Sequence, residues 1–129
     1  MSSQPNAMVL FNPALVLADI PGEFAMGDKI KNLANRMNTN PMNLSPFHQV
    51  NRETPPTIIF HGKADDVVHY KTAELFAAKA GAWGRVELHG YAGQSHGFFN
   101  FKKSNGEFYR KTVAKMDAFF VSLKYLDPQ

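Results

Sequence analysis

Two short apolar runs with a helical stretch between them constrain the fold of this chain more than any other feature. Residues 56–60 (Pro-Thr-Ile-Ile-Phe) and residues 85–89 (Arg-Val-Glu-Leu-His) have the length and the branched side chains of β-strands. Between them, residues 70–80 have the pattern of a helix that ends at Gly81. A strand, a helix and a strand at this spacing form a parallel unit whose crossover is right-handed almost without exception. The sequence therefore predicts two neighbouring parallel strands, about 4.8 Å apart.

The chain before this unit fits the same alternation of strands and helices. Residues 8–11 (Met-Val-Leu-Phe) predict a short buried strand that ends at an Asn-Pro pair. Apolar residues spaced three and four apart predict a helix within residues 23–37. Prolines, asparagines and serines over residues 39–56 predict a loop, with a short helical turn near residues 44–49.

The chain after this unit predicts a long terminal helix. Residues 104–107 (Ser-Asn-Gly-Glu) match a capping box, which is typical of a helix start. One face of the helix is expected to carry Tyr109, Thr112, Val113, Met116, Phe119, Phe120 and Leu123. The whole order of elements predicts a three-layer α/β fold with a short parallel sheet of about three strands. A length of 129 residues predicts a single domain over residues 1–129.

A carboxylate and an imidazole follow the two neighbouring strands. Asp65 lies in a glycine turn after the first strand, and His96 lies in the glycine-flanked loop 93–97 after the second. Because parallel strands end at the same edge of a sheet, where α/β proteins bind ligands, we expect the two side chains to lie together. Such a pair is the acid and base of a Ser-His-Asp triad. The competing interpretations are a turn or helix-capping carboxylate, for which Asp66 is equally well placed, and an ordinary surface histidine.

The nucleophile of such a triad is not evident in the sequence. Residues 93–97 match G-x-S-x-G, the pattern of a nucleophile elbow with Ser95 at its centre. An elbow joins a strand to a helix and precedes the acid, whereas here phenylalanines follow within residues 98–101 and Asp65 comes earlier. Ser95 is therefore the weaker candidate. The serines before Asp65 are Ser2, Ser3 and Ser45, and none of them lies in an elbow.

Composition and charge argue against several other classes of function. The net charge is +3 with scattered basic residues, and a mild basic cluster over residues 102–115 is better explained as a solvated helix face than as a nucleic-acid site. Since no run of 18 apolar residues exists, no membrane span is predicted. The first residues lack the basic and apolar regions of a signal peptide, so we expect a cytoplasmic location.

The histidines near Asp65 do not predict a metal site. His61, Asp65, Asp66 and His69 are close in sequence, but they form no standard set of ligands. The chain has no cysteine, which excludes disulfides and thiolate metal sites. We expect His61 to pack at a strand end and to bond to the backbone. We also expect the chain to use neither a metal nor another cofactor.

Four segments of the chain resemble the carboxyl-terminal half of the α/β-hydrolase family. They are residues 9–13, 44–46, 55–68 and 91–98, and the last two carry Asp65 and His96. The likeness is closest to the esterase and lipase branch, which includes hormone-sensitive-lipase-like and dienelactone-hydrolase-like enzymes. It implies that Asp65 is the catalytic acid, rather than Asp66, and that His96 is the catalytic base. It also implies that the three strands are the last three of an eight-stranded sheet.

The resemblance implies a carboxylic ester hydrolase that is incomplete. The HGGG oxyanion motif and the nucleophile elbow of the family belong to a half that this sequence does not contain. We therefore expect a truncated α/β-hydrolase that acts on a small-molecule ester weakly or not at all when it is alone. The alternative is a non-catalytic interaction module or a stable gene fragment. A flavodoxin-like ligand binder is disfavoured, because the chain has no phosphate-cradling glycine loop.

The resemblance also predicts association with another chain. In the resembled fold, residues 9–11 form an interior strand with neighbours on both sides. Without one neighbour, this apolar strand presents unpaired N–H and C=O groups. We expect either a two-fold homodimer or a partner chain that supplies the amino-terminal half.

Overall fold

The computed structural model describes residues 3–128, and within them three parallel strands form one sheet. The strands are β1 (Met8–Phe11), β2 (Thr57–Gly62) and β3 (Val86–Tyr91), in the order β1-β2-β3. Phe11 lies opposite Phe60 in the first pair, and Phe60 lies opposite His89 in the second. The parallel pairing and the strand order confirm the predicted α/β sheet.

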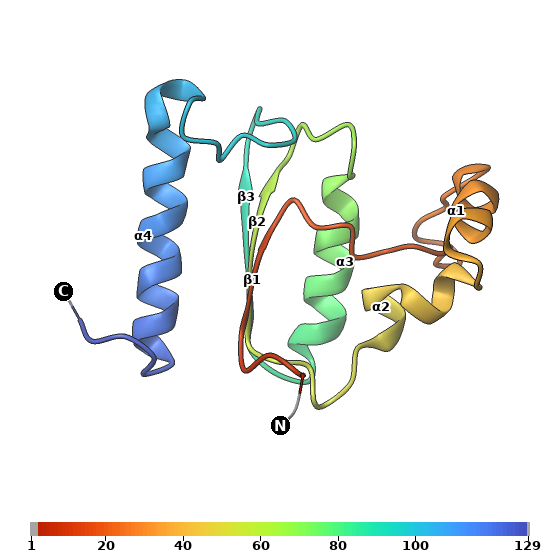
Figure 1. Cartoon of the computed structure of the whole chain (residues 1–129), viewed down its shortest axis with the longest axis horizontal. Coiled ribbons are helices and arrows are strands. Elements are labelled where there is room, and N and C mark those ends of the chain that lie inside the picture. The colour runs from red at the N-terminus through yellow and green to blue at the C-terminus, as the bar shows by residue number, and fades with distance from the viewer. Residues whose placement is uncertain (1–2, 129) are drawn as a thin grey trace.

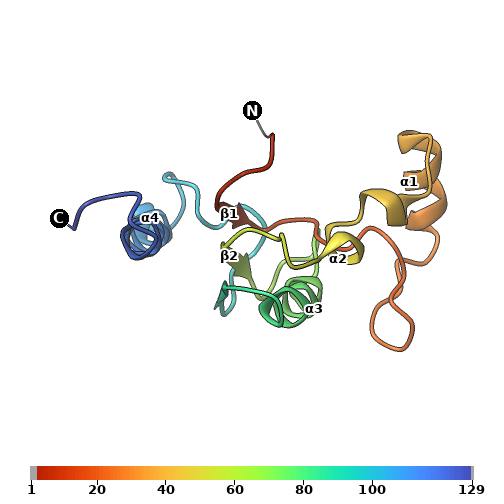
Figure 2. The same cartoon turned by 90° about the horizontal axis from the view of Figure 1, so that it is seen from below.

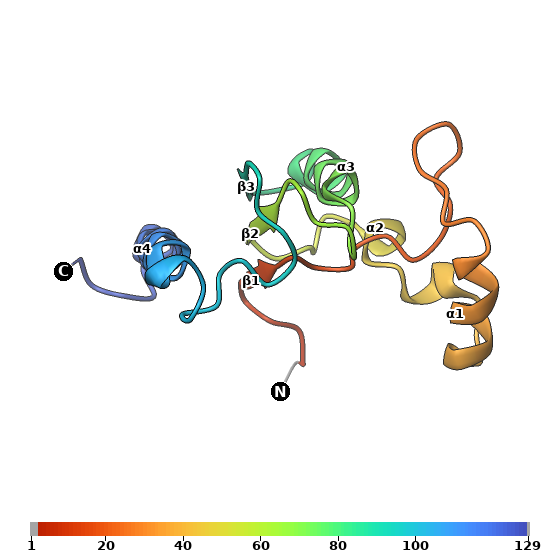
Figure 3. The same ribbon diagram turned by 90° about the horizontal axis from the view of Figure 1, so that it is seen from above.

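Helices cover both faces of this sheet in a three-layer arrangement (Figure 1). One face carries α3 (Tyr70–Gly81) and the short α2 (Pro46–Gln49), the other carries α4 (Glu107–Ser122), and α1 (Lys29–Met37) lies beyond α2. The end-on views in Figure 2 and Figure 3 show α4 and α3 on opposite sides of the strands. Two 3-10 turns, η1 (Pro41–Leu44) and η2 (Ser104–Gly106), precede α2 and α4. Within the described part of the chain, no helix combines the length and apolar character that a membrane crossing requires.

β2 is buried on both faces because it is the middle strand. Its side chains alternate between the two faces of the sheet. Ile59 packs with Phe76 of α3, whereas Ile58 and Phe60 pack with Phe119 of α4. Every residue of β2 is buried, which explains the nearly continuous apolar run in its sequence. The two cores hold β2 in place, so the turn that follows it starts from a fixed position.

The first helix is shorter than the sequence predicted. The helix expected within residues 23–37 begins only at Lys29. Ile20 and Phe24 form an isolated bridge across a turn, which takes the preceding residues out of the helix. Gly22 and Gly27 have φ angles of 75° and 60°, and such left-handed glycines end a helix. The helical turn predicted near residues 44–49 corresponds to α2.

The capping box predicted at residues 104–107 does not form. Ser104 and Asn105 have left-handed φ angles of 47° and 52°. An N-cap serine needs an extended backbone to bond to the first turn of its helix, and Ser104 does not have one. α4 instead starts after Gly106, whose φ of 73° sets the direction of the helix.

The buried face of α4 differs slightly from the prediction. Thr112 and Phe119 are buried, and Met116 packs into the same core, as the spacing predicted. Phe108 also packs there, whereas Tyr109, which was expected on this face, is 43% exposed. Positions 108, 112, 116 and 119 follow the 3.6-residue period of one helical stripe, and position 109 falls beside it.

Candidate active site

The two candidate residues lie at the same edge of the sheet, where the strands end. The turn after β2 is closed by the N–H of Asp65, which donates to the carbonyl of Gly62 at 3.2 Å. His96 lies in the loop after β3, and both connections are at the upper end of the sheet in Figure 1. The carbonyl of Gln94 accepts the N–H of Ala64 at 2.9 Å and so joins this loop to the turn. The parallel order of the strands thus brings together two residues that are 31 positions apart.

Asp65 is the carboxylate that contacts His96. Its side chain is fully buried, whereas Asp66 is exposed. Oδ2 of Asp65 lies 2.8 Å from Nδ1 of His96. An ionised carboxylate can only accept a hydrogen bond, so Nδ1 of His96 carries the hydrogen and Nε2 can keep a free lone pair. This is the tautomer that a general base needs.

Two backbone N–H groups hold the other oxygen of Asp65. Val67 and Val68 both donate to Oδ1 at 2.9 Å. Burial raises the pKa of the Asp65 carboxyl, but hydrogen bonds from Val68, His96 and Val67 outweigh burial and hold this pKa below its ordinary value of 3.8. Asp65 is therefore ionised at neutral pH and can stabilise a positive charge on His96.

A second histidine lies beside Asp65. His61 is fully buried near the end of β2, with Nε2 2.8 Å from the carbonyl of Val68 and 3.4 Å from Oδ2 of Asp65. The prediction that His61 packs at a strand end and bonds to the backbone is confirmed. Its contact with Asp65 was not predicted, and the only signal for it in the sequence is the spacing of four residues.

The loop that carries His96 lies directly against the Cα atom of Gly62. A Cβ atom at this position would lie 2.3 Å from the carbonyl oxygen of Gln94 and 2.9 Å from that of Ser95. Only glycine permits such a close approach between the turn and the loop. The contact sets the height of the loop above the end of β2, and with it the position of His96.

Two glycine turns and one buried phenylalanine hold the loop on either side of His96. Gly93 and Gly97 have φ angles of 70° and 76°, so the chain turns on either side of the histidine. Phe98 is buried against Tyr91, with ring centroids 4.9 Å apart, and ties the loop to the core. The side chain of His96 nevertheless stays 44% exposed. A reacting group can therefore reach it.

Asn12 connects the end of β1 to both of these segments. It is buried and has a left-handed φ of 43°. Its Oδ1 accepts the N–H of Gly62 at 3.0 Å, and its Nδ2 reaches the carbonyl of Ser95 at 3.5 Å. This role was not predicted, because the sequence indicates only that a strand ends at Asn12. The available signal is that asparagine tolerates left-handed backbone angles better than most residues.

Known proteins are similar to this chain in sequence and fold. The BD-FAE family model, an α/β-hydrolase-type domain, matches residues 18–80. A thermophilic esterase from the planctomycete Thermogutta terrifontis superimposes with a TM-score of 0.90 and 40% identity, over 99% of this chain and 46% of its own. The chain therefore has the fold of part of an α/β-hydrolase.

Two further structures of the same esterase are about equally similar to this chain. The butyrate-bound form has a TM-score of 0.90 and 39% identity, over 100% of this chain and 48% of its own. The form phosphonylated by sarin has a TM-score of 0.88 and 38% identity, over 99% and 48%. The chain thus spans less than half of the length of this relative. No curated protein matches the chain.

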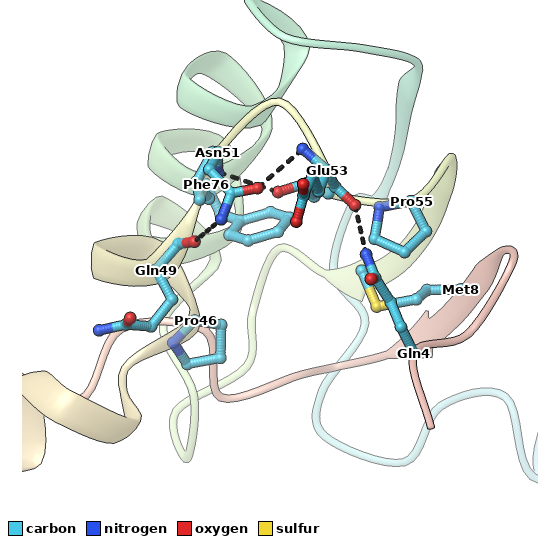
Figure 4. Close-up of a pocket in the computed structure, with 10 residues that line it drawn as sticks. Gln4, Met8, Pro46, Gln49, Asn51, Glu53, Pro55 and Phe76 are labelled. Atoms are coloured by element: carbon cyan, nitrogen blue, oxygen red, sulfur yellow. Dashed lines mark hydrogen bonds between the residues drawn. The ribbon is translucent and has the colours of Figure 1, made fainter. Parts of the chain in front are cut away.

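A hollow of about 360 Å³ is shown in Figure 4. Its lining residues lie toward the amino ends of the strands, whereas Asp65 and His96 follow the carboxyl ends. The hollow is lined by Met8 and Pro55, near the amino ends of β1 and β2, and by Phe76 of α3. Hydrogen bonds at its rim involve Gln4, Gln49, Asn51 and Glu53. Ligands of open α/β sheets bind at the carboxyl ends of the strands. This hollow is therefore in the wrong place to bring a ligand to His96.

The other polar candidates do not form a second site. Ser45 is fully buried, and its Oγ accepts the N–H of Leu17 at 3.0 Å and lies 2.8 Å from Nδ1 of His48. These contacts give it a structural role in the connection between β1 and α2. Ser95 is exposed and directly precedes His96. Over residues 3–128, no three or more His, Cys, Asp or Glu side chains are grouped to hold a metal ion.

Proposed function

We propose that this chain supplies the acid and the base of a serine-dependent carboxylic ester hydrolase. Asp65 is the acid and His96 is the base. The proposal is carried by the 2.8 Å hydrogen bond between Nδ1 of His96 and Oδ2 of Asp65, in which the ring of His96 is still partly exposed. The 40% identity to an esterase supports an ester as the substrate class.

In the proposed reaction, Nε2 of His96 takes the proton of a serine hydroxyl as that oxygen attacks the ester carbonyl. His96 then gives the proton to the departing alkoxide. In the second half of the reaction, His96 takes a proton from water as the water attacks the acyl-serine ester, and returns it to the serine oxygen as the carboxylic acid product leaves. Asp65, which is ionised because its pKa is lowered, stabilises the imidazolium form of His96. The related esterase has been solved with propionate and with butyrate, which favours small esters with short acyl chains over long-chain lipids.

We also propose that the nucleophile and the oxyanion hole come from outside residues 1–129. In this view the chain is one domain that corresponds to the carboxyl-terminal half of an α/β-hydrolase. Two serines of the chain support this proposal. Ser45 is buried in structural hydrogen bonds, and the loop after Ser95 leads to the buried Phe98 rather than directly into a helix. By itself the chain is then inactive or weakly active.

Assays of the purified chain with aryl acetate and aryl butyrate test this last point. Loss of the nucleophile lowers kcat by about six powers of ten in subtilisin, from which this figure is taken, so we expect no turnover at a normal esterase rate. Treatment with paraoxon followed by mass spectrometry is expected to leave Ser95 unmodified. Strong turnover that disappears in Ser95→Ala, or an adduct on Ser95, would make Ser95 the nucleophile.

A chimaera tests the roles of Asp65 and His96. In it, this chain replaces the matching part of the Thermogutta terrifontis esterase, which retains its remaining half. We expect ester hydrolysis that His96→Ala abolishes and that Asp65→Asn lowers about 10⁴-fold in kcat, as the same change does in a serine protease. Asp66→Asn is the matched control, because Asp66 is the exposed neighbour, and it should retain the rate. Equal losses in the two asparagine variants would contradict the assignment.

The second candidate function is a non-catalytic interaction module or a stable gene fragment. It is favoured by the absence of a nucleophile elbow from the sequence. A chimaera that folds and keeps the bond between Asp65 and His96, but hydrolyses no ester, would support this alternative. The coding DNA upstream gives an independent test, because an HGGG motif and an elbow there would identify the segment that completes the enzyme.

We propose that the outer edge of β1 pairs with another strand. Among the described residues, β1 pairs only with β2, and its four side chains are all apolar. The opposite edge strand, β3, carries Glu87 and His89 and directly follows Arg85, and charged residues of this kind discourage strand pairing. The strand that pairs with β1 comes from a second copy of the chain in a two-fold dimer, or from a partner chain that supplies the amino-terminal half. Light scattering of the chain alone is expected to give twice its mass of 14.4 kDa, and a concentration-independent monomer would rule out the dimer.

A further inference from the structure

His61 is a buried polar side chain beside the proposed acid, and the mechanism above gives it no role. Its ring is fully buried, and its Nε2 atom lies 2.8 Å from the carbonyl oxygen of Val68. A carbonyl can only accept, so Nε2 carries a hydrogen and donates it. The same nitrogen lies 3.4 Å from Oδ2 of Asp65, the oxygen that also accepts from His96.

The backbone of Val68 connects the two side chains through the peptide groups on either side of its Cα atom. The N–H of Val68 donates to Oδ1 of Asp65 at 2.9 Å, while its carbonyl accepts from His61. The turn from Asp65 to Val68 is therefore held at both ends, by the carboxylate on one side and by the imidazole on the other. If the imidazole donor is lost, the carbonyl of Val68 is no longer held. The φ and ψ angles of Val68 then gain freedom, and its N–H is a less fixed support for the carboxylate.

The other ring nitrogen argues against a role in packing alone. Nδ1 of His61 is buried and has no hydrogen-bond partner among the described residues. Burying an unpaired polar atom costs free energy, so an apolar side chain of similar shape would pack at this position at lower cost. The ring of His61 also makes a T-shaped contact with the ring of Tyr70, with centroids 5.7 Å apart. What distinguishes histidine here is the donor at Nε2.

We propose that His61 is a positioning residue that holds the carboxylate of Asp65 in line with His96 through the backbone of Val68. The inference rests on the proposed function of the Asp65–His96 pair. It assigns His61 no contact with substrate. Its effect is to keep Oδ2 of Asp65 directed at Nδ1 of His96, so that the imidazole retains the tautomer and the orientation of a base.

Variants of the 129-residue chain separate the donor from the volume of the ring. His61→Gln places an amide N–H near the position of Nε2 and is expected to preserve the site. His61→Leu fills similar space without a donor, and His61→Asn is polar but its amide reaches only the position of Nδ1. His69→Leu is the control, since His69 is an exposed histidine near the same turn. Urea unfolding of each variant establishes that it is folded.

The readout is the nitrogen-bound ring proton of His96 in ¹H–¹⁵N spectra, assigned by its loss in His96→Ala. We expect the wild type, His61→Gln and His69→Leu to show a strongly downfield Nδ1–H signal, and His61→Leu and His61→Asn to lose it. In the same two variants, a ¹³C titration of the Asp65 carboxyl is expected to show that its pKa has risen toward the ordinary value. A general loss of stability does not produce this pattern, because His61→Gln restores the signal.

The outcomes distinguish this inference from the proposed function. An unchanged His96 signal in folded His61→Leu or His61→Asn shows that His61 does not position Asp65, and leaves the proposed pair intact. Loss of the signal in folded His61→Gln as well shows that the ring acts by its shape, which also overturns the inference. Absence of the signal from the wild type removes the hydrogen bond on which the proposed function rests.

Discussion

Gly62 lies where the turn after β2 touches the loop of His96, and a single added carbon should separate them. In Gly62→Ala the new Cβ would lie 2.3 Å from the carbonyl oxygen of Gln94, whereas ordinary contact starts at 3.4 Å. The loop must therefore retreat by about 1 Å. The three closest atoms, the carbonyl oxygen and carbon of Gln94 and the carbonyl oxygen of Ser95, all belong to the backbone, so no side-chain rotation can relieve the clash.

This displacement carries His96 away from Asp65. Overpacking of this kind costs about 1–3 kcal/mol, and loss of a hydrogen bond to a charged group costs about 1.5–3 kcal/mol. We expect the free energy of unfolding to fall by about 3 kcal/mol, out of the 5–15 kcal/mol that is typical of a domain. The bond between Nδ1 of His96 and Oδ2 of Asp65, now 2.8 Å, should lengthen beyond hydrogen-bond range.

Urea unfolding and the ¹H–¹⁵N spectrum of the His96 ring measure the two effects separately. Gly81→Ala is the matched control, because its Cβ would meet nothing within 4 Å and Gly81 ends α3 in a helical conformation. We expect that variant to be as stable as the wild type or more stable by about 0.5–1 kcal/mol. A Gly62→Ala variant with wild-type stability and an unchanged His96 signal would refute the reasoning.

Two further predictions concern the acid and the core. The folded pKa of Asp65 is lowered, so its contribution to stability is complete above the unfolded pKa of about 3.9 and is lost as the pH falls through the folded value. The difference in unfolding free energy between wild type and Asp65→Asn should therefore be constant near pH 7 and shrink below about pH 4, and a difference that grows in acid would contradict this sign. Phe119 is 1% exposed in the core under α4, so Phe119→Ala should cost about 3–5 kcal/mol in urea unfolding. Phe101→Ala, at a residue that is 65% exposed, should cost less than about 1 kcal/mol, and equal losses would mean that α4 does not pack as described.

The elements that the sequence predicted correctly are marked by local patterns of apolar residues. The runs that became β2 and β3 and the helical period of α3 are local patterns, and the rule that parallel strands end at one edge was enough to bring Asp65 and His96 together. The start of α1 and the turn before α4 were predicted incorrectly, because left-handed residues such as Gly27 and Asn105 redirect the chain without changing its apolar pattern.

The residues that support the site have no such signal. Asn12 and Gly62 act by bringing together backbone segments that are 50 positions apart in the chain. His61 acts through the carbonyl of Val68, and no spacing in the sequence indicates which carbonyl a buried imidazole will reach. These contacts depend on the distance between the turn and the loop, which is determined only when the layers pack. For this reason the contact between Asp65 and His96 could be predicted, and the residues that support it could not.

The side chain of Asn12 makes the seating of β1 and the alignment of the proposed catalytic pair interdependent. Because Asn12 contacts the backbone of both Gly62 and Ser95, β1 cannot slide or tilt without pulling on the loop that carries His96. A strand that binds the free edge of β1 selects one position of β1, and through Asn12 it selects one position of His96. Edge binding and site alignment are then linked equilibria, and each favours the other by the same free energy. The imidazole of His96 is therefore aligned most firmly when another strand is bound at the edge of β1.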